Sequence, residues 1–166
     1  LTVVCNTKET DGEKAKFCLY TSEVRFGSDE SDLRWVWMYT CNFLNSAEDI
    51  SNNDGDATNN GGYVTDADLK QMMTGTHIVM GYATKATLCS SMADKFGMYL
   101  QEGNTIYDAY FKAGNTGETD VATENHYQKI LYIPQARYET IYSPAVHYEY
   151  DVSDVIIVKR CIHDAY

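Results

Sequence analysis

Cys41 is the residue whose chemistry raises the first question, because it directly follows the apolar segment RWVWMYT at residues 34–40. Aromatic and apolar residues occupy both sets of alternating positions in this segment, which predicts a strand covered on both faces. Reactive groups gather at the carboxyl ends of strands in α/β sheets. Two interpretations follow. Cys41 is either a nucleophile held at a strand end or a small core residue, which cysteine commonly is.

A nucleophilic cysteine requires a base nearby, since a thiol with an ordinary pKa is mostly protonated at neutral pH. His77 opens the next expected strand, residues 76–83, so in a parallel sheet it would lie at the edge opposite Cys41. The remaining histidines all lie in the C-terminal third of the chain, and one of them could fold back toward Cys41. These histidines are His126, His147 and His163. Histidines of this kind are more commonly exposed surface residues or residues that stabilise the fold.

A polar loop at residues 51–64 is rich in Asn, Asp and Gly and has the residue types of a calcium site. Carboxylate, amide and hydroxyl oxygens are the ligands that Ca²⁺ prefers, and an EF-hand loop adds a glycine turn and a closing acid. Counted from Asp56, Gly61 takes the turn position, but the closing acid falls one residue late. The loop is therefore either a calcium site or a solvated polar loop. The predicted ligands are Asp54, Asp56, Thr58, Asn60 and Asp68.

The composition limits the classes of partner. With 166 residues the chain can form one domain with its own core, and we expect a single domain over residues 1–166. The 24 acidic and 13 basic residues give a formal net charge of -11, which argues against nucleic acid and anionic membranes as partners. No apolar run is long enough to span a bilayer. The many Tyr, Asn, Thr, Ser and Gly residues favour an extracellular or cell-surface location, and the initial Leu leads us to expect a segment upstream.

Strand and helix patterns alternate along the chain. Capping patterns of the form Ser/Thr-x-x-Asp at Thr65, Ser91 and Thr105 predict the starts of three helices. This alternation predicts an α/β fold with a mainly parallel sheet flanked by helices. Pro134 indicates that the strand around it lies at a sheet edge or ends early. The expected strands are residues 1–6, 15–22, 34–40, 76–83, 129–136 and 154–162.

Three segments in this order resemble the caspase-like fold: RWVWMYTC, HIVMGYAT and FGMYLQEGNTIYDA. Gingipain-type peptidases, bacterial domains associated with tetratricopeptide repeats and uncharacterised bacterial proteins of the same clan share this order. The resemblance covers about residues 15–114. It implies that Cys41 corresponds to the nucleophile and that a histidine in the turn after the preceding strand is the base.

The matching turn, residues 21–27, departs from the family pattern because it contains no histidine. Glu23 would raise the pKa of a nearby thiol, and Arg25 could favour a thiolate but cannot shuttle a proton. The family fold also has further strands before this turn. The chain therefore resembles the later portion of the fold, and either an upstream part or strand complementation by another chain completes the sheet.

These observations predict a non-catalytic, caspase-like module of a secreted or surface bacterial protein that acts by self-assembly or binding. The alternative is a cysteine peptidase of the caspase and gingipain clan, in which Cys41 attacks the scissile carbonyl and backbone N–H groups stabilise the oxyanion. A tyrosine-rich segment at residues 138–150 suits contacts with proteins or sugars, or is a loop with partly buried rings. Apart from calcium, no cofactor is expected.

Overall fold

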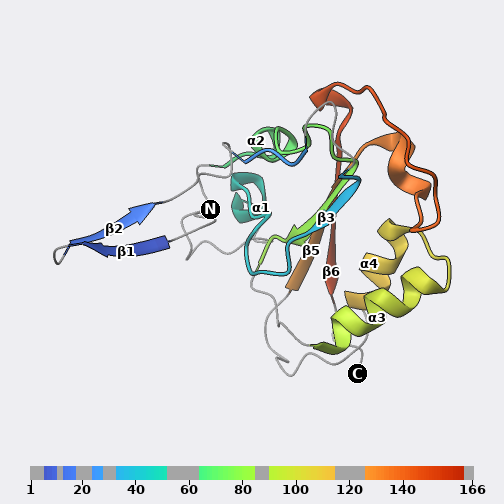
Figure 1. The fold of residues 1–166 in the computed structure, drawn as a ribbon, viewed down its shortest axis with the longest axis horizontal. Coiled ribbons are helices and arrows are strands. Elements are labelled where there is room, and N and C mark those ends of the chain that lie inside the picture. Colours follow the sequence, from blue (N-terminus) through green and yellow to red (C-terminus); the bar gives the residue numbers. More distant parts are fainter. Residues whose placement is uncertain are drawn as a thin grey trace.

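The computed structural model describes residues 6–10, 13–17, 24–27, 33–51, 64–84, 90–114 and 126–162. Its main feature is one four-stranded sheet with helices on both faces (Figure 1). The strands are β3 (Trp35–Trp37), β4 (Ile78–Tyr82), β5 (His126–Tyr132) and β6 (Ile156–Ile162), in the order β3-β4-β5-β6. β3 and β4 run parallel, whereas β5 is antiparallel to both β4 and β6.

The prediction of a mainly parallel, caspase-like sheet is therefore wrong, since one pair is parallel and two pairs are antiparallel. The reason lies in the connections. A connection that runs back along the sheet returns the chain to the end of the sheet where the first strand began and makes the next strand parallel, as between β3 and β4. Between β4 and β5 the chain instead forms two helices, α3 and α4, that pack against each other. It therefore returns to the same end of the sheet at which β4 finishes. β5 then has to run antiparallel to β4.

One face of the sheet is covered by α3 (Ser90–Gln101) and α4 (Ile106–Gly114). Rings from both helices meet the aromatic residues of β3 there: the Trp37 ring lies 4.8 Å from that of Phe96 and 6.0 Å from that of Tyr110. One face of α4 is apolar and fully buried: Ile106, Ala109, Tyr110 and Ala113. This face is the aromatic core of the domain.

The opposite face carries two short helices, α1 (Ala47–Ser51) and α2 (Asp66–Lys70), which Figure 1 shows on the other side of the sheet from α3 and α4. The predicted capping box before α2 is confirmed: Thr65 accepts from Asp68 N–H, and the Asp68 carboxylate accepts from Thr65 N–H. Thr105 also caps the start of α4, since Asp108 N–H donates to Thr105 Oγ1 and the Thr105 hydroxyl donates to Asp108 Oδ2. Ser91, in contrast, lies inside α3, which begins one residue earlier.

Near the N-terminus, β1 (Asn6–Thr10) and β2 (Glu13–Phe17) form an antiparallel hairpin that is a sheet of its own (Figure 1). The strands expected at residues 1–6 and 15–22 overlap this hairpin only at Asn6 and at residues 15–17, and the rest of them lies outside the described residues. The four-stranded sheet is thus built from residues after 33.

The C-terminal part is irregular between β5 and β6. Pro134 ends β5 as expected and starts the 3-10 helix η4 (Pro134–Tyr138), and a second 3-10 turn, η5 (Val152–Asp154), precedes β6. Because β6 begins opposite the last residue of β5, the whole connection stays at one end of the sheet. No helix in the described part of the chain is long and apolar enough to cross a membrane.

Two glycines of the sheet and helix layers should respond to alanine in opposite directions. A Cβ on Gly97, inside α3, would meet nothing within 4 Å, so Gly97→Ala should raise the free energy of unfolding by about 0.5–1 kcal/mol. A Cβ on Gly81 would lie 3.0 Å from Leu44 Cγ and 3.2 Å from Phe43 Cδ1, so Gly81→Ala should lower it by about 1–3 kcal/mol. Urea unfolding of both variants tests this packing, and equal effects would contradict it.

Candidate functional site

Cys41 lies in a turn beyond β3, at the carboxyl ends of the parallel pair β3 and β4. The turn is held to the chain after β4 because Asn42 N–H donates to Thr84 O at 2.9 Å and Leu44 N–H donates to Tyr82 O at 3.0 Å. Asn42 has a φ of 56°, a left-handed conformation that asparagine tolerates better than most residues. Cys41 itself is half-buried.

His126 belongs to the same end of the sheet as Cys41. Its neighbour Tyr127 donates its N–H to Thr84 Oγ1 at 2.9 Å and accepts from Ala83 N–H, so Thr84 is bonded to the residues beside both Cys41 and His126. His126 is 5% exposed. The antiparallel direction of β5 is what brings it here, and a parallel sheet would have placed it elsewhere. Sequence patterns gave no signal for this neighbourhood.

His77 lies at the opposite end of the sheet from Cys41, as the sequence predicts. It precedes β4, and its Nδ1 forms a buried 2.7 Å hydrogen bond with Glu139 Oε1. The Tyr148 ring covers the imidazole at a centroid distance of 4.9 Å. The hydrogen bond fixes the orientation of the imidazole ring.

The turn that matches the histidine-bearing turn of the resembled family is hydrogen-bonded to the chain before His77, and its Phe26 ring also lies 6.1 Å from the ring of Phe43, two residues after Cys41. Phe26 N–H donates to Met72 O at 2.8 Å, and Phe26 O accepts from the hydroxyl of Thr76. Arg25 is exposed and donates to Val24 O at 2.8 Å. Glu23 lies outside the described residues. The described residues of this turn, 24–27, include no histidine.

Four of the five predicted calcium ligands, Asp54, Asp56, Thr58 and Asn60, lie outside the described residues. The fifth, Asp68, uses Oδ2 in the cap of α2, where it accepts from Thr65 N–H and Thr65 Oγ1–H at 2.8 Å each. These bonds hold the pKa of Asp68 below its usual value. Within the described ranges, no three His, Cys, Asp or Glu side chains gather into a group that could hold a metal ion.

A buried charge cluster lies between β5 and the two short helices. Lys129 is 1% exposed, and its ammonium donates to Asp49 Oδ2 at 2.7 Å, to Asp66 Oδ1 at 2.6 Å and to Ser46 Oγ at 3.1 Å. Lys159 on β6 donates to Asp49 Oδ1 at 2.7 Å. Two ammonium groups thus face two carboxylates. We call Ser46, Asp49, Asp66, Lys129 and Lys159 the buried ion cluster.

Asp49 is the centre of this cluster. Burial alone would raise its pKa, but the charge of Lys129 and the hydrogen bonds from Lys129, Lys159 and Ser46 outweigh burial and lower the pKa below 3.8. A carboxyl whose pKa is lower in the folded protein contributes stability at neutral pH. That stability is lost as the pH falls below 3.8 and through the lowered pKa. All three ammonium protons of Lys129 have acceptors, so the cluster serves structure and not proton transfer.

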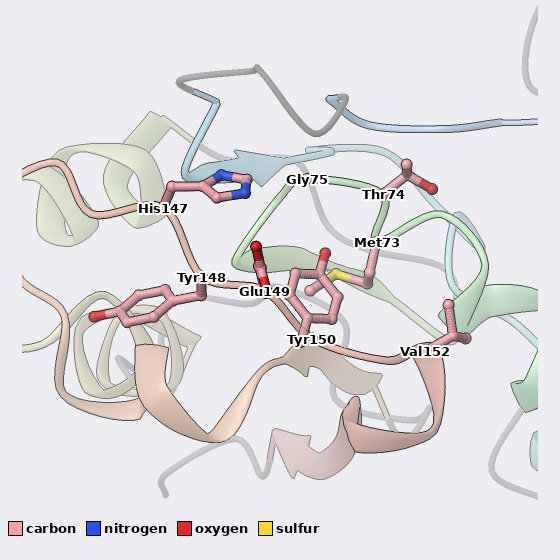
Figure 2. Close-up of a pocket in the computed structure, with 8 residues that line it drawn as sticks. All are labelled: Met73, Thr74, Gly75, His147, Tyr148, Glu149, Tyr150 and Val152. Atoms are coloured by element: carbon pink, nitrogen blue, oxygen red, sulfur yellow. The ribbon is translucent and has the colours of Figure 1, made fainter.

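A surface pocket lies at the His77 end of the sheet, with a volume of about 360 Å³ (Figure 2). One wall is the turn before β4, and the other is the connection that leads into β6. Met73 is the buried residue of its lining, whereas His147 and Glu149 are exposed. The lining consists of Met73, Thr74, Gly75, His147, Tyr148, Glu149, Tyr150 and Val152.

Tyr148 connects this pocket to the buried pair behind it, because it both lines the pocket and covers His77. Glu139 uses Oε1 for His77, while its Oε2 is buried and has no hydrogen-bond partner in the structure. A buried carboxylate oxygen without a donor costs about 1–3 kcal/mol or more. The sequence indicated neither this pair nor the pocket, since the tyrosine-rich segment predicted only general contacts.

The chain belongs to a family described as a domain of unknown function, DUF6345, whose model matches residues 3–131. No curated protein and no solved structure matches the chain. The family match includes Cys41, His77, His126 and Lys129 and ends within β5. Glu139, Tyr148 and the whole of β6 lie beyond the matched residues.

Removal of the buried ammonium should strongly destabilise the protein. Lys129→Met leaves Asp66 and one oxygen of Asp49 without their partner, so we expect the free energy of unfolding to fall by about 3 kcal/mol. Urea unfolding at neutral pH measures this loss. Lys112→Met is the matched control, because Lys112 is exposed on α4, and it should change stability by no more than about 0.5 kcal/mol. Equal stability of the two variants would contradict a structural role for the cluster.

Proposed function

We propose that this member of the DUF6345 family is a non-catalytic module that assembles with further copies of itself by strand addition at the outer edge of β6. The observation that carries the proposal is the position of β6, which is the last strand in the order of its sheet. A terminal strand presents a row of backbone N–H and C=O groups that can pair with another chain.

The length and composition of β6 support pairing. It has seven residues, IIVKRCI, which is longer than β3 at the other edge with three. Four of its residues are β-branched and therefore favour strands. Ile156 is 39% exposed and Val158 is half-buried, so part of the apolar surface of this strand is accessible. An edge strand of this kind is a favourable site for association.

Edge strands are commonly protected from pairing by Lys or Arg side chains. The two basic residues of β6 instead contact their own domain. Lys159 donates to Asp49, and the Arg160 guanidinium lies 4.5 Å from the centroid of the Phe111 ring. These contacts direct both charges toward the helix and cluster layers, and thus support an edge whose backbone can accept a partner strand.

Sedimentation should show association that depends on protein concentration, and the variant Ile156→Lys should shift the protein toward monomer. The added charge on the exposed start of β6 has to be desolvated when a second strand pairs there. Met98→Lys is the matched control, because Met98 is 45% exposed on α3, away from the edge, and this variant should associate like the wild type. A folded wild-type protein that stays monomeric at all concentrations would remove the proposal.

A cysteine peptidase is the second candidate function, with Cys41 as nucleophile. The observation in its favour is that Thr84 bonds to the neighbours of both Cys41 and His126. In this mechanism His126 would take the thiol proton, and the thiolate would attack the scissile carbonyl carbon and form an acyl-enzyme as the amine leaves with that proton. The missing histidine in residues 21–27 favours the non-catalytic module instead.

Labelling with iodoacetamide at neutral pH separates the two candidates. We expect Cys41 to react no faster than Cys161, a second half-buried cysteine that serves as an internal control. Peptide mass spectrometry of a time course measures both rates. Rapid reaction at Cys41 that slows in His126→Gln would instead favour the peptidase, because a neighbouring imidazole raises the thiolate fraction.

The remaining expectations from the sequence belong to the same proposal. We place the module in a secreted or surface protein of a bacterium, because of its acidic balance and its tyrosine content. Calcium at residues 51–64 would add a stabilising ligand, so a chelator would lower the unfolding temperature if the loop binds this ion.

A further inference from the structure

We infer that the pocket between residues 73–75 and 147–152 binds an ammonium or guanidinium group, such as the side chain of a lysine or arginine of another polypeptide. Its volume of about 360 Å³ lies within the range of pockets that accept small ligands or single side chains. The site is separate from the edge of β6 and does not depend on assembly.

The charge of the lining favours a cation. Glu149 is the carboxylate among the lining residues, and these residues include neither Lys nor Arg. It is exposed, and Figure 2 shows its carboxylate beside Tyr150. The whole chain carries a formal net charge of -11, which attracts cations and repels anions on approach. His147 also lines the pocket, so a carboxylate or phosphate ligand would find one imidazole there but neither Lys nor Arg.

The walls suit the apolar stem of such a side chain. Tyr150 is held in place because its hydroxyl donates to Thr76 O at 2.9 Å, and Met73 is buried beneath the pocket. Tyr148 is held by its contact with the His77 ring. Fixed aromatic rings attract cations through their faces, and the four-carbon stem of lysine can pack along them.

The His77–Glu139 pair lies behind Tyr148 and supports this wall of the pocket. Glu139 is 5% exposed, and its Oε1 lies 2.7 Å from His77 Nδ1. Because Glu139 is paired with His77, the carboxylate that a ligand meets in the pocket is that of Glu149.

Titration followed by NMR amide shifts tests the inference with defined probes. Nα-acetyl-lysine amide and agmatine should shift the amides of Gly75 and of residues 147–150, whereas Nα-acetyl-norleucine amide, which keeps the stem and lacks the charge, should not. A short lysine-containing peptide that binds more tightly than the free lysine amide would indicate a polypeptide ligand. Tighter binding of agmatine alone would indicate a free amine.

Glu149→Gln keeps the size of the side chain and removes its charge, so it should weaken binding of the lysine amide by about tenfold. Glu102→Gln is the matched control, since Glu102 is exposed beyond α3, and it should leave binding unchanged. The inference would be overturned if the lysine and norleucine amides bound equally, if a neutral sugar such as glucose bound in preference, or if no cation shifted the amides.

Sedimentation of Glu149→Gln should match that of the wild type. A failure of the cation titration therefore leaves the assembly proposal separately testable.

Discussion

The ammonium of Lys129 is the group on which the rest of one face of the sheet depends. It has almost no contact with water, and its three protons are shared among Asp49, Asp66 and Ser46. An ammonium moved from water into the protein costs several kcal/mol unless carboxylates surround it. The two short helices supply these carboxylates. Five-residue helices are too short to be stable by themselves. The ion pairs of Asp49 and Asp66 with Lys129 therefore help to hold α1 and α2 against the sheet.

The same cluster sets the position of Cys41 and of β6. Ser46 directly follows the turn that contains Cys41, and its hydroxyl donates to Asp49. Leu44, within the same turn, lies against Gly81 of β4. Asp49 of α1 also accepts a hydrogen bond from Lys159, which links the edge strand β6 to this helix. Ion pairs exposed to water contribute little to folding stability, but a buried ion pair that loses one member leaves an uncompensated charge in the protein. The cluster therefore couples the cysteine turn, both short helices and the edge strand.

Much of the local structure could be predicted from the sequence because its causes are local. The caps at Thr65 and Thr105, the buried face of α4 and the end of β5 at Pro134 follow from neighbouring residues. Strand direction was predicted wrongly because it depends on how two helices pack after β4. Lys129 gave no usable signal, since a lysine within an apolar strand usually points to water. The acids that bind it are 63 and 80 residues away along the chain. The neighbourhood of Cys41 and His126 was missed for the same reason as the strand direction.

The two ends of the sheet differ in what they can do. At the Cys41 end, backbone N–H groups of Asn42 and Tyr127 donate to the carbonyl and the hydroxyl of Thr84, and the turn at residues 24–27, which would carry the base, includes no histidine. At the His77 end, a carboxylate, an imidazole and tyrosines lie around a pocket that opens to solvent. The connection from β5 to β6 supplies most of this second end, and it also delivers β6 to the edge. A segment that follows the family match thus forms both the pocket wall and the open strand. The proposed binding pocket and the proposed assembly edge thus share the segment at residues 147–162, with residues 73–75 as the other wall of the pocket. The catalytic arrangement that the resemblance implies would instead have to be built from residues before 131.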